Sequence, residues 1–319
     1  MTSRIPHLLE PYLPHLPQEA TLVVLTSVLG ASTNWLVLRH LHALLKPSSA
    51  SQNKNKNKKP TPLSEGGRQA ENEHDDEQQE EVAVLLLSFL RDLPFWRENL
   101  SRLGIDLEAA ARRGRFGFVD GLGGLFSPGN GQQPQSQQQQ PQSQPQQPWN
   151  RALTSAAPGD IGRVVLEGVE QLKTGSSSTA GEGRERKVVL VIDGLDFVLA
   201  ALDPRLGQGA GDSSGAAAVM KDMLMELREK THAAIVTLAA DDPLIKEQET
   251  TLEKQHAWFA LSLAHEADMV LSLRLLDTGA AKDVSGVIRI THGGARAKDH
   301  EYLYHVGGDG GVRVFERGQ

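Results

Sequence analysis

The most constraining feature of the chain is the stretch from Thr21 to Leu41, TLVVLTSVLGASTNWLVLRHL. It begins with a continuous apolar run from Leu22 to Val28, which predicts a buried strand. After a short turn, the apolar spacing from Asn34 to Leu45 predicts a helix that Ser32 or Thr33 can cap. A buried strand, a tight turn and a helix in this order are typical of the start of a nucleotide-binding α/β domain.

The turn lacks the residues that bind phosphate. A P-loop follows the pattern G-x-x-x-x-G-K-[ST], in which backbone N–H groups and the lysine hold the phosphates. Here the turn spans Ser27 to Asn34 without a lysine, and no Gly-Lys pair occurs in the chain. We therefore predict a degenerate nucleotide cleft, with no catalytic residue, cofactor or metal ion, formed by Gly30, Thr33, Asn34 and Asp193.

Asp193 ends the apolar segment Lys187 to Asp193, KVVLVID, which predicts a second buried strand. A strand that ends in an acid holds Mg²⁺ in P-loop enzymes, and ligands bind at the carboxyl ends of strands in open α/β sheets. Because no P-loop accompanies it, we favour the alternative that Asp193 hydrogen-bonds to the turn Gly194-Leu195. Asp196 is expected to cap the turn that follows.

Composition and charge limit the possible functions. The chain has 319 residues, of which 39% are hydrophobic, and no cysteine, which excludes disulfides, thiolate metal sites and cysteine nucleophiles. Its longest apolar run, Val82 to Leu90, is far shorter than the roughly 20 residues needed to span a membrane, so we expect a soluble protein. The formal net charge of −7 provides no global basic field for nucleic acid. Any RNA contact is therefore expected to be local or shared with a partner.

Several segments have compositions that cannot build a packed core. Residues 47–81 pass from a basic, Asn-rich stretch to an acidic one, and residues 121–148 are mainly a Gln/Pro tract. Smaller polar or glycine-rich breaks lie at 174–186 and 204–215. We interpret all four as insertions into a single domain of residues 1–319.

The rest of the chain alternates between apolar strands and helices. Strands are predicted at 22–28, 82–87, 116–119, 188–192, 233–238 and 269–275. Helices are predicted at 34–45, 93–103, from a cap at Asp160, around 219–227 and at 252–264. The last part predicts antiparallel hairpins at 284–291, 302–306 and 312–315. This pattern predicts an α/β fold with a mainly parallel central sheet, helices on both faces and antiparallel C-terminal hairpins.

The other motifs in the sequence lack the structural context that their usual functions need. Gly211 to Gly215 matches G-x-S-x-G, but a polar stretch precedes the serine where a nucleophile elbow needs a strand. Gly121 to Gly124 lacks the third glycine and the helix of a dinucleotide-binding loop. The histidines show no metal-ligand spacing, and we expect surface or supporting positions for them. The tryptophans of the predicted helices are expected in the core, namely Trp35, Trp96 and Trp258.

An ordered series of stretches resembles a known family. These are TSVLGASTNWLVLRHL (26–41), VLLLSFLRDLPFWRENLSRLGIDL (84–107), RFGFVDGL (115–122), VVLVIDGLDFVLAA (188–201) and HAWFALSLAHEADMVLSLRLLDTGAAKDVSGVIRITHGG (256–294). They resemble the sixth subunit of the Elongator complex, in a fungal-type form with low-complexity expansions. The resemblance covers nearly all of the foldable core, and no single stretch is a catalytic signature.

The resemblance implies a RecA-like fold without a P-loop, a pseudo-ATPase. It implies that the chain joins Elongator subunits four and five in a hetero-hexameric ring, which associates with the catalytic Elongator subunits, binds tRNA and supports modification at C5 of wobble uridines. It also implies a cytoplasmic or nuclear location without membrane contact. By analogy with RecA-like rings, loops that face RNA are expected near Arg205 and Lys246.

We therefore expect a non-enzymatic, RecA-like Elongator subunit that contributes to ring geometry and tRNA handling. Two alternatives remain open from the residues. One is an active nucleotide hydrolase with a non-standard phosphate loop. The other is a protein-interaction module whose role in transcription is indirect.

Overall fold

The computed structural model describes residues 5–46, 82–126, 148–174, 185–202, 215–276, 281–293 and 299–317. Most of the four predicted insertions lies outside these residues, so their role as insertions into one domain stays a prediction. Within the 121–148 segment, residues 121–126 are described. There Gly123–Phe126 forms a short helix, α5, after strand β3.

The described residues form one ten-stranded sheet in the order β10-β9-β8-β7-β1-β6-β5-β2-β3-β4. Neighbouring strands from β4 to β7 pair in parallel, whereas β8, β9 and β10 pair antiparallel at one edge. The strands are β1 Thr21–Ser27, β2 Val82–Ser88, β3 Phe116–Asp120, β4 Asn150–Ala152, β5 Lys187–Asp193, β6 Ala233–Ala239, β7 Met269–Arg274, β8 Gly286–His292, β9 His300–Val306 and β10 Val312–Phe315. The predicted α/β class, with antiparallel C-terminal hairpins, is confirmed.

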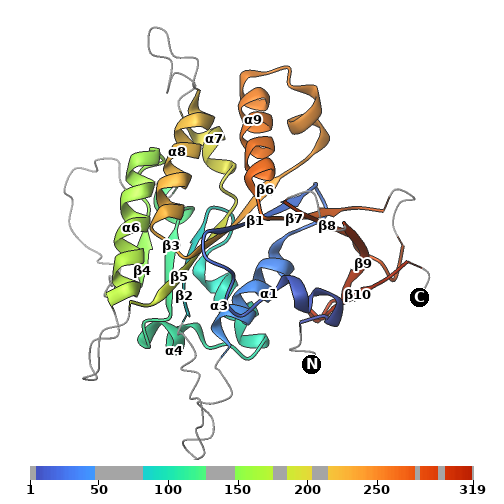
Figure 1. The fold of residues 1–319 in the computed structure, drawn as a ribbon, viewed down its shortest axis with the longest axis horizontal. Helices are drawn as coiled ribbons and strands as arrows, with labels where there is room; N and C mark the ends of the chain where they lie inside the picture. The colour runs from blue at the N-terminus through green and yellow to red at the C-terminus, as the bar shows by residue number, and fades with distance from the viewer. Residues whose placement is uncertain are drawn as a thin grey trace, which may run out of the picture.

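Helices cover both faces of the sheet (Figure 1). One face packs against η1 His7–Tyr12, α1 Asn34–Leu45, α3 Leu93–Arg102 and α4 Leu107–Arg112. The other packs against α6 Pro158–Thr174, α7 Phe197–Ala201, α8 Ala216–Glu229 and α9 Thr251–Glu266. Alternate residues of β1 enter the two cores, with Val23 and Leu25 on the α1 side and Leu22 and Val24 on the α9 side. The continuous apolar strands of the sequence are therefore buried on both faces.

Several local expectations were wrong. Asp160 does not cap α6, because the helix begins at Pro158 and Asp160 lies in its first turn beside Arg163. For His40 and His42 the surface alternative is excluded and the supporting one remains, since both are buried in α1, and burial lowers the pKa of His40 to about 3. Trp258 was expected in the core, yet 46% of it is exposed. None of the helices in the described residues is long and apolar enough to cross a membrane.

Candidate functional site: the carboxyl edge of the sheet

The residues of the predicted cleft lie where the parallel strands end, at the edge that binds ligands in open α/β sheets. Strand β1 ends at Ser27, β5 ends at Asp193, and β6 ends at Ala239 between them. The structure thus brings the β1–α1 turn to the same edge as the acid that ends β5. The question is whether this edge offers a site for phosphate or metal.

The β1–α1 turn is a tight turn rather than a wide phosphate loop. The Ala31 N–H donates to the Val28 carbonyl across 2.9 Å, and Gly30 has φ +89°, as the third residue of a type II turn requires. The Leu29 N–H donates to the Asp241 carboxylate, with 2.6 Å between Leu29 N and Asp241 Oδ1. The protein's own acid therefore holds a position that an anion would take at this turn.

The remaining turn residues offer no positively charged side chain that could bind a phosphate. Thr33 is buried and precedes α1 without a side-chain cap bond, and Asn34 is the first residue of that helix. The Asn34 N–H donates to Ser32 Oγ at 3.2 Å. The first cation after the turn, Arg39, is only 2% exposed, and its Nη2 donates to the Gly310 carbonyl at 3.4 Å. Burial lowers the pKa of Arg39, which contacts the β9–β10 hairpin rather than the cleft.

Asp193 has no exposed surface and is enclosed by the neighbouring strands. Its carboxylate accepts the hydroxyl of Ser88 on β2 at 2.9 Å and the hydroxyl of Thr237 on β6 at 3.2 Å. The Gly194 N–H donates to Thr237 Oγ1 at 2.7 Å, so the turn is held through Thr237 rather than by Asp193 directly. Burial raises the pKa of Asp193. These contacts fit a structural acid that joins three strands.

Asp196 and His256 hold the end of β6. The Ala239 N–H donates to Asp196 Oδ2 at 3.1 Å, and His256 Nε2 lies 2.9 Å from the Ala239 carbonyl. Asp196 makes no side-chain cap bond to α7, so the expectation that it caps this turn was wrong. Burial raises its pKa, and His256 Nδ1 lies 3.9 Å from its carboxylate. Sequence reasoning missed this pair because the two residues are far apart in the chain.

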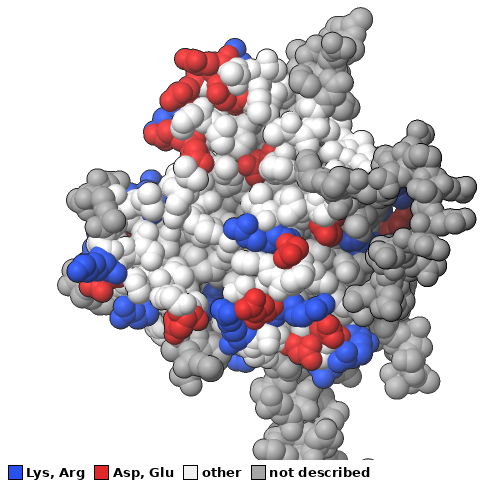
Figure 2. Space-filling model, turned by 180° about the vertical axis from the view of Figure 1, so that it is seen from behind, with Lys and Arg blue, Asp and Glu red and all other residues white. Residues whose placement is uncertain are grey.

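Of the two loops expected to face RNA, only the one at Lys246 lies within the described residues. Arg205 lies outside the described residues. Lys246 is exposed on the short helix η2, Pro243–Glu247, and its Nζ pairs with Asp242 at 2.8 Å. Acids dominate its surroundings, as Figure 2 shows for the lobe of η2 and the start of α9; they include Asp241, Asp242, Glu247, Glu249 and Glu253. RNA contact by Lys246 stays a prediction, and it would require Lys246 to leave Asp242.

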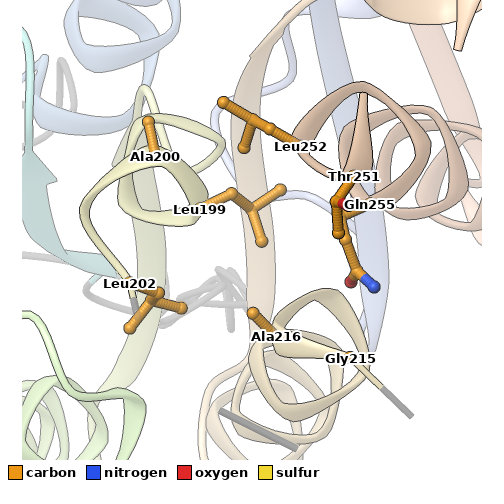
Figure 3. A pocket seen from close by; sticks show the side chains of 8 residues that line it. All are labelled: Leu199, Ala200, Leu202, Gly215, Ala216, Thr251, Leu252 and Gln255. Carbon is orange, nitrogen blue, oxygen red and sulfur yellow. The ribbon is translucent and has the colours of Figure 1, made fainter. Parts of the chain in front are cut away.

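A small cavity lies away from the predicted cleft, between α7, α8 and α9 (Figure 3). Its volume is about 130 Å³, below the roughly 300–1,000 Å³ of typical ligand sites. Leu199 and Leu252 point into it from opposite sides, and Gln255 lies at its rim, where its Oε1 accepts the Ala217 N–H at 2.9 Å. The cavity is therefore not a nucleotide pocket. In the described residues, no three His, Asp or Glu side chains gather as a metal ion would need.

Large apolar side chains are exposed at the same edge of the sheet. Leu29, at the tip of the β1–α1 turn, is 86% exposed, and Leu275 follows β7 beside Gly30. Leu90 follows β2 and borders Gly194, while Phe197 begins α7 after β5. Apolar side chains thus surround the position where a nucleotide would bind, and such a surface fits protein contact better than a polyphosphate.

The mainly parallel sheet, covered by helices on both faces, defines an α/β protein of the RecA-like fold. A crystal structure of a KaiC-like protein from the hyperthermophilic archaeon Pyrococcus horikoshii OT3 matches with a TM-score of 0.51 and 14% identity. The match covers 98% of this chain and 97% of that chain, and it is a likeness of fold. No curated protein matches the sequence.

The model of the family described as Elongation complex protein 6 matches residues 78–306. The chain therefore belongs to this family and is a subunit of the Elongator complex. The predicted resemblance is confirmed at this level.

Proposed function

We propose that the chain is a non-catalytic, RecA-like subunit that joins Elongator subunits four and five in a hetero-hexameric ring. The ring binds tRNA and supports C5 modification of wobble uridines together with the catalytic Elongator subunits, in the cytoplasm and nucleus. The chain provides the contact surfaces that shape the ring, and it does not hydrolyse a nucleotide. Family membership supports the assignment to Elongator, and the following features of the cleft support the non-catalytic role.

The observation that carries the proposal is the β1–α1 turn itself. Its Leu29 N–H is already bound by Asp241, its first cation is buried, and its tip presents an exposed leucine. A phosphate group placed there would meet the Asp241 carboxylate without a lysine to offset the two negative charges. The same turn, with Leu275 beside it, offers apolar area for a neighbouring subunit.

Nucleotide binding by the isolated chain is a direct test. A ligand at 100 times its Kd stabilises a protein by about 2.7 kcal/mol, so its binding is visible in thermal unfolding. We expect no upward shift of the unfolding midpoint of the full chain with excess Mg-ATP. A P-loop RecA-like ATPase in the same buffer serves as the positive control. A clear shift that the non-hydrolysable analogue reproduces would favour the active-hydrolase alternative.

Assembly is tested by the native mass of the complex. Co-expression with subunits four and five is expected to give a hexamer with two copies of each chain. If the chain stays monomeric, or if the other two form the same ring without it, the ring proposal is wrong. Neither outcome would affect the family assignment, which rests on the sequence match.

A further inference from the structure

The outer face of α8 and α9 exposes large apolar side chains. On α9, Trp258 and Leu261 are 46% and 53% exposed, and their three-residue spacing places them side by side. On α8, Met225 is 47% exposed. Lys221, one turn before Met225, lies with its Nζ 5.5 Å from the centre of the Trp258 ring, so the two helices present one surface. We call Met225, Trp258 and Leu261 the α8–α9 face.

The cations between the two helices are already paired. Lys221 forms an ion pair with Glu266, and Arg228 lies 4.0 Å from the same carboxylate. Lys221 therefore holds the Trp258 ring by a cation–π contact while its charge is offset by Glu266. This contact restricts the Trp258 side chain before binding, so a partner that covers the ring causes a smaller loss of Trp258 side-chain entropy.

An acidic row borders Met225 on the side away from α9. Asp222, Glu226 and Glu229 are exposed at spacings of four and three residues, so they lie on one side of α8. No ion pair to any of the three is present among the described residues, in contrast to Lys221 and Arg228 on the α9 side of the same helix. Like charges four residues apart destabilise a helix, which makes a cationic partner favourable here.

We propose that the α8–α9 face binds a basic amphipathic helix of a partner protein. Its apolar side would cover Trp258, Leu261 and Met225, and its Lys or Arg side chains would reach the acidic row. The acids disfavour RNA and anionic lipid, because both carry negative charge. They also disfavour a second copy of this chain, which would bring the same acids to the interface. The inference goes beyond the proposed function and does not depend on it.

The probe is a synthetic 18-residue helical peptide of Leu and Lys with one apolar side, and its control replaces every Lys by Glu. Full-length chain is titrated with each peptide, and hydrogen exchange maps the protected amides. We expect the Leu/Lys peptide to bind and to protect α8 and α9, and the Leu/Glu peptide to bind about tenfold or more weakly, a difference of about 1.4 kcal/mol.

Two variants test the two parts of the surface. Leu261→Asp and the triple change Asp222→Lys, Glu226→Lys and Glu229→Lys should each weaken binding about tenfold or more. The matched control reverses three acids on α6, Asp160→Lys, Glu167→Lys and Glu170→Lys, which gives the same change in net charge and should leave affinity within about twofold. Circular dichroism confirms that each variant is folded.

Several results would overturn the inference. These are equal binding of both peptides, protection outside α8 and α9, or an equal loss in the α6 control, which would indicate attraction to net charge alone. Self-association that Leu261→Asp abolishes would assign the face to a second copy. Binding of tRNA by the full-length chain, if Leu261→Asp abolished it, would assign the face to nucleic acid.

Discussion

Asp193 joins three strands, and its burial has a consequence for stability. Both hydroxyl protons of Ser88 and Thr237 point to its carboxylate, and each hydroxyl oxygen accepts a backbone N–H, from Arg91 and Gly194 respectively. Desolvation by burial outweighs these bonds and raises the pKa of Asp193. The folded chain therefore holds this proton more tightly than the unfolded chain does.

The sign of the pH dependence follows from that shift. The stabilisation by protonated Asp193 is fully present below its unfolded pKa and is lost as pH rises through the raised folded value. We expect the change in unfolding free energy from pH 4 to pH 7, measured by urea unfolding, to be more positive in Asp193→Asn than in the natural chain, because the amide does not titrate. Asp196 contributes with the same sign, so the variant removes only part of the destabilisation that buried acids cause as pH rises. An unchanged pH profile would show that Asp193 does not titrate in this range.

At this scale the sequence predicts where the candidate residues lie, but not what they contact. The rule that parallel strands end at one edge placed Asp193 near the β1–α1 turn. The bonds that decide its role come from β2 and β6, 105 and 44 residues away. Asp241 closes the turn at a separation of 212 residues. No local pattern reports contacts at such distances. The bond between the Leu29 N–H and Asp241 was therefore not predictable from one sequence.

At the scale of single elements, α9 shows how a local signal fixes a boundary. The Glu253 N–H donates to Thr250 Oγ1 at 3.2 Å, and the Glu253 carboxylate accepts the Thr250 N–H at 2.8 Å. This capping box starts the helix at Thr251 and ends the turn after η2. The Thr-x-x-Glu pattern was visible in the sequence and could have placed the start.

Removing the cap should destabilise the chain. Thr250→Ala is expected to lower the unfolding free energy by about 1 kcal/mol, within the range of 0.5–2 kcal/mol found for lost N-caps. Thr251→Ala is the matched control, because Thr251 is exposed and follows the cap. Urea unfolding of both variants measures the difference. Equal losses would mean that the cap bond is not what stabilises the start of α9.

Long periodic elements were predictable, whereas only some of the short ones were, such as β10 at Val312–Phe315. The helix at Asn34–Leu45 was predicted with both bounds, because its apolar spacing extends over several turns. Strand β4 and helices α4 and α7 were missed, because their three to six residues show no clear apolar period of their own. Trp258 was misplaced for a different reason. Position on an amphipathic helix predicts one buried side, but it cannot show which large side chain faces outward.

At the scale of the whole molecule, charge determines how the chain can contribute to RNA binding. Non-specific affinity for nucleic acid comes mostly from neutralised phosphates and falls with salt. A chain of net charge −7, with an acidic lobe around Lys246, provides little of that affinity by itself. Basic groups from several subunits would have to converge on the tRNA.

We therefore expect negligible tRNA binding by the isolated chain and salt-sensitive binding by the ring with subunits four and five. Binding titrations at two salt concentrations, on the chain alone and on the ring, measure this directly. Lys246→Glu should weaken tRNA binding by the ring without dissolving it, if the η2 loop faces the RNA. Arg102→Glu is the matched control, since Arg102 is also an exposed cation paired with an acid four residues away. Tight tRNA binding by the isolated chain would contradict a mainly structural role in the ring. Equal effects of the two substitutions would contradict contact between the η2 loop and the RNA.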